Sequence, residues 1–324
     1  MPKKILYVYC PCYVAEAMLE GFEHISETYG VEVTCVRQLD SLLEEVTVDM
    51  LEAADLVVRT RFNSLGFPKT PNLKPYQDKV VMVDSSDGRR LFVDVHCSLY
   101  LKREYHPWFV EDLKFNPMLL PPPKRNGAIK RIQLLNKTYP FSMCASKVCW
   151  EVEPPPWEER DIDVFFVVGM SNSIRVEVDK ILNSLTDCGV VMSQCYGGKK
   201  GRIPFDQYLG YLRRSKIAVS AYGAGQDCYS YYEIPSCGAL LLAQRRTILI
   251  NNNFVDGKEA IYWDNVEEIP GLIRRLRDDE GTTKEIAAAG REKLLRYHTS
   301  YGRVLELLDL AKSKMGIDVL GGVS

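Results

Sequence analysis

The sequence predicts an α/β protein that contains two doubly wound domains in tandem. In both halves of the chain, short apolar runs alternate with segments of helical periodicity, and a proline-rich segment separates the halves. The length agrees, because 324 residues exceed the roughly 100–200 residues of a typical domain. Strands that alternate with helices form a parallel sheet with helices on both faces.

The first domain opens with a strand over residues 5–10, which Pro11 ends. Apolar residues at helical spacing then predict a helix over 14–28, with Gly30 beyond its end. The further elements expected in this half are strands at 31–36, 55–58 and 79–84 and a helix at 42–51.

Residues 107–156 have a different composition, because nine of the 17 prolines lie there. Proline lacks a backbone N–H group and restricts the residue before it, so we expect an irregular connector with one strand at 129–135. We place the domain boundary at residue 150, with residues 1–150 in the first domain and 151–324 in the second.

The second domain repeats the alternation. The expected strands are 163–168, 190–195, 216–221, 239–242 and 260–263, and the expected helices are 174–185, 205–214 and 229–236. A helical pattern follows from Val266, with breaks expected at Pro270, Gly281 and Gly302, and the last helix can cross back to the first domain. Ligands of such sheets bind at the carboxyl ends of the strands.

The composition excludes several classes of protein. A hydrophobic share of 46% is too high for a disordered chain. No apolar run reaches the roughly 18–20 residues that span a bilayer, and no secretory signal opens the sequence. The ten cysteines form no CxxC pair and the four histidines are scattered, so we expect reduced thiols and no metal site. The sequence predicts a cytoplasmic protein without membrane insertion.

The formal net charge of −2 conceals a basic stretch at residues 113–150. This stretch contains no acidic residue, and its basic residues are Lys114, Lys124, Arg125, Lys130, Arg131, Lys137 and Lys147. Two interpretations stay open. It is either a solvated face between the domains or a surface that attracts a nucleic acid.

Four segments of the second half carry a resemblance to a known family. They are YLGYLRRSKIAVS (208–220), YEIPSCGAL (232–240), NFVDGKEAIY (253–262) and EIAAAGRE (285–292). Their order and spacing resemble those of group 1 glycosyltransferases, especially the CgeB-like branch, over roughly residues 160–310. The resemblance implies the GT-B fold, which consists of two Rossmann-like domains. It also implies metal-independent transfer of a hexosyl or pentosyl group from a nucleotide-sugar, UDP-linked, to a hydroxyl.

Under this resemblance, Glu233 matches the family's acidic residue that accepts hydrogen bonds from the donor ribose. A carboxylate suits this role because it can accept from both vicinal hydroxyls. A solvent-facing helix glutamate is the simpler alternative. The sequence departs from the family at Ser230, where many relatives have an arginine, and at Gly225, where the related E-x7-E pattern has an acid.

The glycine-rich segment 222–228 is the second candidate part of the donor site. It links a strand to a helix, so its main-chain amides can approach a phosphate. The donor-binding candidates in this segment are Tyr222, Gly223, Gly225 and Gln226. A dinucleotide fingerprint is excluded because Cys228 stands at the third glycine position.

Cations are needed to stabilise the diphosphate leaving group. Gly169 ends a strand, and Arg175 follows at the start of a helix, which makes Arg175 the first candidate. Arg202 and Lys199, on a glycine-flanked loop, form a second set. Each of these cations can equally be an ordinary surface charge.

An inverting reaction also requires a base that deprotonates the acceptor hydroxyl. Asp84 and Asp87 follow directly after a predicted strand, and His96 is a third candidate. The alternative for the two aspartates is an Asx-type turn. Two other functions stay open. One is a nucleotide-sugar epimerase on the same fold, and the other is a non-catalytic sugar-nucleotide-binding or structural protein. A hydroxymethylated DNA base is one conceivable acceptor.

Overall fold

The computed structural model describes residues 2–39, 42–43, 45–61, 69–87, 91–92, 95–113, 121–197 and 201–321. The chain divides into two compact units. Unit 1 comprises Met1–Ser142, Thr247–Asn251 and Ser300–Ser324, and unit 2 comprises Met143–Arg246 and Asn252–Thr299. The division falls at residue 142, where the sequence analysis places it at 150, and the last helix belongs to unit 1.

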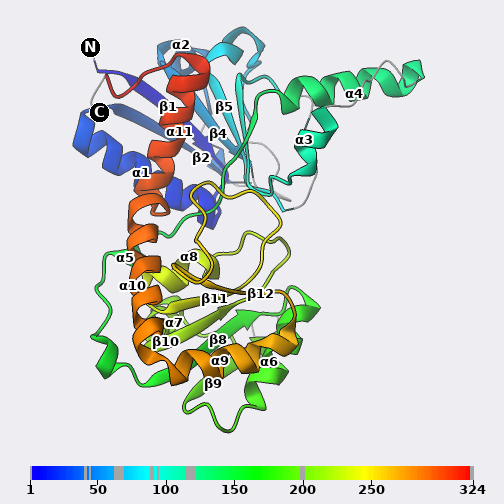
Figure 1. Cartoon of the computed structure of the whole chain (residues 1–324). Coiled ribbons are helices and arrows are strands. Elements are labelled where there is room, and N and C mark those ends of the chain that lie inside the picture. Colours follow the sequence, from blue (N-terminus) through cyan, green and yellow to red (C-terminus); the bar gives the residue numbers. More distant parts are fainter. Residues whose placement is uncertain are drawn as a thin grey trace. The chain divides into compact units, whose positions relative to one another are not determined.

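In the described part of the chain, unit 1 contains a seven-stranded sheet in the order β3-β2-β1-β4-β5-β6-β7 (Figure 1). All its neighbouring strands pair in parallel except β3, which is antiparallel to β2. The strands are β1 (Lys4–Tyr9), β2 (Glu32–Leu39), β3 (Leu42–Leu43), β4 (Leu56–Arg61), β5 (Val80–Asp84), β6 (Leu99–Lys102) and β7 (Thr138–Pro140). Strands β4 and β5 are almost wholly buried, as parallel strands covered on both faces require.

Two long helices of unit 1 come from opposite ends of the chain. Helix α1 (Tyr13–Tyr29) packs along α11 (Ser300–Met315), and the two lie side by side in Figure 1. Their contact depends on Gly21, because a Cβ atom there would lie 2.4 Å from the Ser300 carbonyl oxygen. The shorter α2 (Val48–Ala53) replaces most of the helix predicted at 42–51, and Thr47 caps its first turn.

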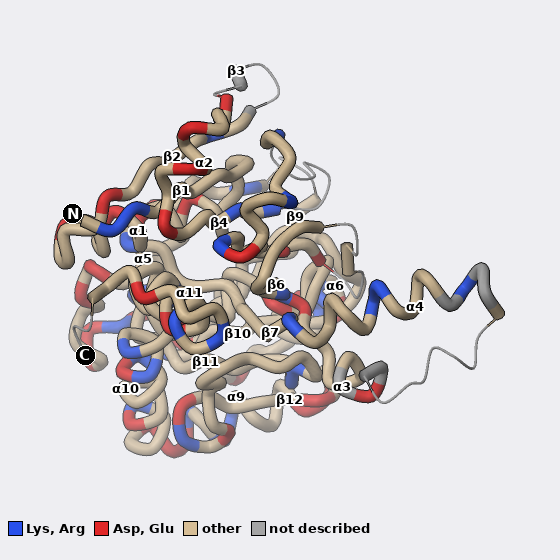
Figure 2. The backbone as a smooth tube through the Cα atoms, turned by 90° about the horizontal axis from the view of Figure 1, so that it is seen from above, with Lys and Arg blue, Asp and Glu red and all other residues tan. Residues whose placement is uncertain are grey.

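The proline-rich connector is more regular than the sequence analysis predicts. It contains α3 (Trp108–Leu113) and α4 (Pro122–Leu135), so the strand expected at 129–135 is wrong. A proline suits the first helical turn, where its missing N–H group has no intrahelical partner, and α4 begins in this way. Figure 1 shows α4 projecting from the rest of unit 1, and Figure 2 shows Lys and Arg along it.

Unit 2 contains a five-stranded parallel sheet in the order β12-β11-β10-β8-β9 within the described residues. Its strands are β8 (Ile162–Gly169), β9 (Val191–Tyr196), β10 (Ser215–Ser220), β11 (Leu240–Gln244) and β12 (Ile261–Trp263). Its helices are α5 (Lys147–Trp150), α6 (Ser173–Asn183), α7 (Phe205–Arg213), α8 (Ser230–Ser236), α9 (Ile269–Asp278) and α10 (Glu280–Tyr297). The strands predicted for this half agree with these bounds to within two residues.

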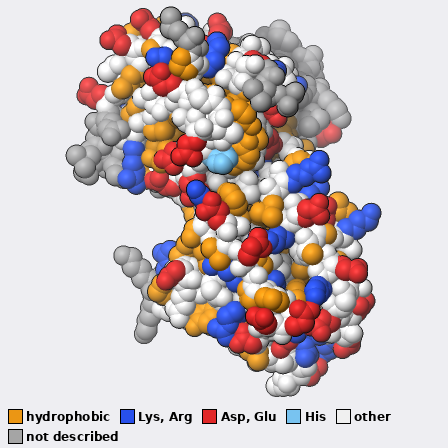
Figure 3. All heavy atoms as spheres, turned by 90° about the vertical axis from the view of Figure 1, so that its left-hand side faces the viewer, with side chains coloured by type: hydrophobic (Ala, Val, Ile, Leu, Met, Phe, Trp, Pro, Cys, Tyr) orange, Lys and Arg blue, Asp and Glu red, His pale blue; other side chains and the backbone are white. Residues whose placement is uncertain are grey.

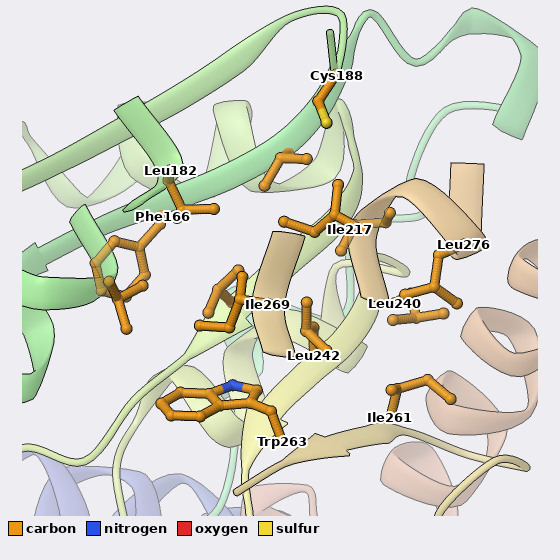
Figure 4. Close-up of a cluster of buried hydrophobic side chains, with 14 of the residues drawn as sticks. Phe166, Leu182, Cys188, Ile217, Leu240, Leu242, Ile261, Trp263, Ile269 and Leu276 are labelled. Carbon is orange, nitrogen blue, oxygen red and sulfur yellow. The ribbon is translucent and has the colours of Figure 1, made fainter. Parts of the chain in front are cut away.

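One core of unit 2 lies between this sheet and helices α6, α9 and α10. Figure 4 shows apolar side chains from β8, β10, β11 and β12 meeting those of α6 and α9, with Trp263 fully buried among them. The helical pattern that starts at Val266 breaks three times, as predicted, but each break lies a few residues before Pro270, Gly281 or Gly302. Pro270 and Gly281 lie in first helical turns, where neither residue costs a hydrogen bond, and Gly302 lies inside α11.

On the side seen in Figure 3, acidic and basic side chains are interspersed. All ten cysteines are free thiols, and seven of them are buried. Among the helices of the described ranges, none has the length and apolarity that crossing a membrane requires.

Candidate functional site

The carboxyl ends of β8 and β10 are the point in unit 2 where this topology favours ligand binding. The two strands are neighbours, but the chain passes from β8 to β9 on one side and from β10 to β11 on the other. Ligands of open α/β sheets bind at such a switch point. The loops that meet there are residues 170–172 after β8 and 221–229 after β10.

Arg175 ties these two loops together. From the first turns of α6, its guanidinium donates to the Tyr222 carbonyl at 2.8 Å, the Gly169 carbonyl at 2.8 Å and the Ala221 carbonyl at 3.3 Å. The predicted phosphate candidate therefore lies at the switch point, and most of its donors hold the main chain of the site.

Gly223 allows this close approach. A Cβ atom at Gly223 would lie 2.8 Å from Nη2 of Arg175 and 3.2 Å from Oγ of Ser171. Asn172 adds a second link, because its Oδ1 caps α6 at the Ile174 N–H while its Nδ2 donates to the Gly223 carbonyl at 3.2 Å. The glycine-rich loop is thus fixed to the start of α6.

The buried side chains of Cys228 and Asp227 form hydrogen bonds that stabilise the loop. The Gly223 N–H donates to Sγ of Cys228 at 3.1 Å, and that thiol contacts the Gly225 carbonyl at 3.3 Å. Burial raises the pKa of Cys228, so the thiol stays protonated and packs within the loop. Asp227 is buried and accepts from the Tyr232 hydroxyl at 2.8 Å.

Glu233 is not a solvent-facing helix residue. It is 6% exposed, and its Oε2 accepts from the Tyr208 hydroxyl of α7 at 3.1 Å. Burial and the neighbouring carboxylate raise the pKa of Tyr208 well above its usual value, which keeps the phenol protonated as a donor. The carboxylate is therefore held in a fixed position by Tyr208, on the helix that follows the glycine-rich loop.

The sequence analysis does not single out Arg246, which the structure places in this site. Its Nη2 donates to Oγ of Ser220 at 3.2 Å, and Ser220 contacts Oγ of Ser230 at 3.0 Å. The guanidinium lies 3.9 Å from the ring centroid of Tyr231 and 5.6 Å from that of Tyr222. A pair of arginines after β11 was visible in the sequence, but no local pattern connects Arg246 to Ser220.

The other residues predicted to bind the nucleotide-sugar donor are Gln226, Tyr222, Arg202 and Lys199. Gln226 is half-buried in the loop, and the Tyr222 N–H donates to Oε1 of Gln244 at 3.0 Å. Arg202 is exposed beyond β9, and among the described residues no contact joins it to the loops of the switch point. Lys199 lies outside the described residues.

Two of the three base candidates of unit 1, Asp84 and Asp87, lie at or just after the carboxyl end of β5. Asp84 is fully buried, and its Oδ2 accepts from the Tyr100 hydroxyl at 2.6 Å and from the Lys102 ammonium at 3.2 Å. Lys102 is also fully buried and donates to the Ser86 carbonyl at 3.1 Å. Asp84 therefore acts as an acceptor for its own neighbours and is shielded from solvent.

The other two candidates are more accessible. Asp87 has a side chain that is 26% exposed and forms an ion pair with the buried Arg103. His96 is exposed between β5 and β6. Of the three, Asp87 combines partial exposure with a fixed position.

The chain is similar to known glycosyltransferases in sequence family and in fold. Residues 185–309 match the family Glyco_trans_1_2, described as glycosyl transferase-like. A glycosyltransferase from Rickettsia africae has a similar structure over 100% of both chains, with a TM-score of 0.56 and 9% sequence identity. The chain has the GT-B fold. The predicted fold and the predicted resemblance to glycosyltransferases are confirmed, and the CgeB-like branch stays a prediction.

Two further GT-B neighbours have comparable similarity. Sucrose-phosphate synthase from Thermosynechococcus elongatus aligns over 96% of this chain and 98% of its own, with a TM-score of 0.51 and 9% identity. The Staphylococcus aureus MnaA structure with UDP aligns over 96% of both chains, with a TM-score of 0.50 and 11% identity. No curated protein matches the sequence.

Proposed function

We propose that the protein transfers a sugar from a UDP-linked nucleotide-sugar to a hydroxyl acceptor. The observation that carries this proposal is the β8/β10 switch point. There Arg175 holds the glycine-rich loop, and Glu233 lies on the helix that follows this loop, with its carboxylate held by Tyr208. The family match over residues 185–309 supports the same reaction class, and MnaA shows that a GT-B neighbour binds UDP.

In this proposal, Glu233 accepts hydrogen bonds from the ribose hydroxyls of the donor. Its hydrogen bond from Tyr208 holds the carboxylate in one orientation, so little side-chain entropy is lost when the ribose binds. The loop at Gly223 and Gly225 carries main-chain amides toward the diphosphate. Arg175 fixes that loop.

The reaction is proposed to be independent of metal ions. The diphosphate needs positive charge as the glycosidic bond breaks, and protein cations at the switch point supply it. Transfer that continues undiminished in EDTA supports this part of the proposal, and restoration of lost activity by Mg²⁺ or Mn²⁺ contradicts it.

Asp87 is proposed as the base that takes the proton of the acceptor hydroxyl. It is partly exposed, and Arg103 orients it. Asp84 is proposed to have a structural role, in which it holds the side chains of Lys102 and Tyr100 in place. His96 is the alternative base. Asp87→Asn should lower kcat by about 100-fold or more with little change in donor affinity, whereas equal loss in His96→Gln would favour the histidine.

The decisive experiment measures nucleotide-sugar binding and turnover with the whole chain. UDP-sugars should raise the melting temperature of the wild type and not that of Glu233→Ala, because a ligand stabilises the folded state that binds it. Glu267→Ala, at an exposed position in the first turn of a short helix of the same unit, is the control. No shift with any nucleotide-sugar would refute the proposed donor site.

Turnover measured without an acceptor distinguishes a transferase from the two alternatives, an epimerase and a non-catalytic binding protein. An epimerase converts the donor sugar alone, whereas a transferase releases UDP only when it hydrolyses the donor or finds an acceptor. Binding without either reaction would identify a non-catalytic sugar-nucleotide-binding protein.

A hydroxymethylated DNA base is a proposed acceptor, and helix α4 supports it. Lys124 and Lys130 are exposed on this projecting helix (Figure 2), whereas Lys137 donates to the Cys97 carbonyl. Binding of hydroxymethylated duplex DNA should weaken steeply with salt and fall in Lys124→Glu/Lys130→Glu. Salt-independent binding, or none, would exclude this acceptor.

A further inference from the structure

The two arginines at the switch point of unit 2 share an electrostatic feature that the buried Arg160, at the opposite edge of the same sheet, also has. Arg246 is 9% exposed, and Arg175 is half-buried. Within the described residues, neither forms an ion pair with a carboxylate. Their polar partners are carbonyl oxygens, the Ser220 hydroxyl and the Cys228 thiol. A buried cation normally requires an anion, because neutral partners only partly replace its hydration.

Arg246 also has an unused donor. Its Nη1 donates to the Gln244 carbonyl at 2.5 Å and its Nη2 to Ser220, but its Nε is buried without a hydrogen-bond partner among the described residues. Buried donors in native proteins are rarely left unpaired, and a functional ligand is one common reason. The orphan N–H group and the uncompensated charge lie on the same side chain.

The two charges flank the glycine-rich loop. Nη2 of Arg175 lies 3.6 Å from Sγ of Cys228, and the charge of Arg246 also acts on that thiol. Arg175 reaches the loop from α6 and Arg246 from the end of β11. An anion at this loop would therefore meet positive charge from two elements.

We propose that Arg246 supplies the positive charge that binds the diphosphate of the nucleotide donor. The ligand class is a nucleoside diphosphate, and the inference rests on the proposed function. Arg175 chiefly holds the loop, whereas Arg246 has an N–H group without a hydrogen-bond partner and forms no ion pair within the described residues. Stacking on Tyr231 fixes the guanidinium in place, so it needs little reorganisation when the anion binds.

The test compares UDP with uridine by isothermal titration of the full chain. Arg246→Gln should weaken UDP binding by roughly 10- to 100-fold, as expected for the loss of a charge-assisted hydrogen bond, and leave uridine binding unchanged. Arg246→Lys, which keeps the charge, should lose less. Equal weakening of UDP and uridine would overturn the proposal, because it would mean that Arg246 only maintains the loop.

Arg245→Gln is the matched control. This neighbouring arginine is exposed and forms ion pairs with Asp256 and Asp264, so its loss should not change UDP affinity. UDP binding by Arg246→Gln at the wild-type level would also overturn the proposal. If the wild type binds neither UDP nor uridine, the proposed function itself fails, which separates the two conclusions.

Relocation of the charge gives a second test for the case in which the single variant folds poorly. Ser230 contacts Ser220, which is the partner of Arg246, so an arginine at 230 can bring its guanidinium to the same place. Ser230→Arg combined with Arg246→Ala should recover at least tenfold of the UDP affinity lost in Arg246→Ala. No recovery in a folded double variant would contradict the placement of the diphosphate.

Discussion

The buried pair of Asp84 and Lys102 should be strongly coupled in the free energy of unfolding. Both side chains are fully buried, and the carboxylate lies 3.2 Å from the ammonium. Within the described residues, the Lys102 ammonium donates hydrogen bonds to Asp84 and Ser86 only. Asp84→Asn removes the one carboxylate that pairs with Lys102 among the described residues. Removing one partner of a buried ion pair lowers the free energy of unfolding by about 3–5 kcal/mol.

The magnitude depends on which partner is removed. In Lys102→Met, Asp84 keeps the Tyr100 hydroxyl at 2.6 Å and Arg61 at 3.5 Å, so we expect a smaller loss of about 1–3 kcal/mol. The double variant contains neither charge of the pair. It should be more stable than the sum of the single losses predicts, by a coupling of about 2–3 kcal/mol.

Urea denaturation of the four proteins at pH 7 gives this coupling directly. The exposed pair of Lys4 and Glu32, 3.2 Å apart in the same unit, is the control. A cycle with Lys4→Met and Glu32→Gln should give less than about 1 kcal/mol. A coupling for Asp84 and Lys102 no larger than that of the exposed pair would refute the reasoning.

Three further predictions concern the loop, the thiols and the caps. Gly223→Ala should lower the free energy of unfolding by about 1–3 kcal/mol and weaken UDP binding, because its methyl group would lie 2.8 Å from a guanidinium nitrogen; an unchanged urea midpoint and unchanged UDP affinity would contradict this. Burial raises the pKa of Cys97 and Cys237 to about 11, so the folded state keeps protons that the unfolded state releases from pH 9, and stability should fall between pH 9 and 11. Urea midpoints across that range should fall less in Cys97→Ala and Cys237→Ala, and equal falls would count against the shift. Asn172→Ala should cost about 1–2 kcal/mol and weaken UDP binding, whereas Thr47→Ala should cost about 1 kcal/mol without affecting UDP, as titration and urea unfolding can show.

The regular elements were predictable where local pattern and tertiary burial agree. Strands such as β5 and β8 are apolar on both faces because helices cover both sides of the sheet, and such runs are visible in the sequence. Strands β6 and β7 were missed because three or four residues carry too little periodicity. Helix α4 was missed because three consecutive prolines suggest a break, although they also fit a helix start.

The site was only partly predictable, for a different reason. Glu233 and the glycine-rich loop form a contiguous motif, so the sequence shows them. Arg175 was found from its place after a strand, but its bonds to the main chain at 221 and 222 join residues about 46 positions apart. Ser230 stands where similar proteins have an arginine, and only the fold shows that Arg246 lies beside Ser220, the partner of Ser230.

Buried cations with and without carboxylate partners lie at different places in the two units. In unit 1, the buried cations Lys102 and Arg103 each have a carboxylate partner, Asp84 and Asp87 respectively, so those charges are compensated without a ligand. In the described part of unit 2, the polar partners of Arg246 and of the half-buried Arg175 are neutral groups. The buried Arg160 likewise contacts carbonyl oxygens, but it lies at the amino ends of β10 and β11, at the edge of the sheet opposite to the switch point. An uncompensated buried charge lowers the stability of the free protein and favours an anion at that place. Binding of a diphosphate there therefore supplies the missing counter-charge, and stability should depend on donor more strongly in unit 2 than in unit 1.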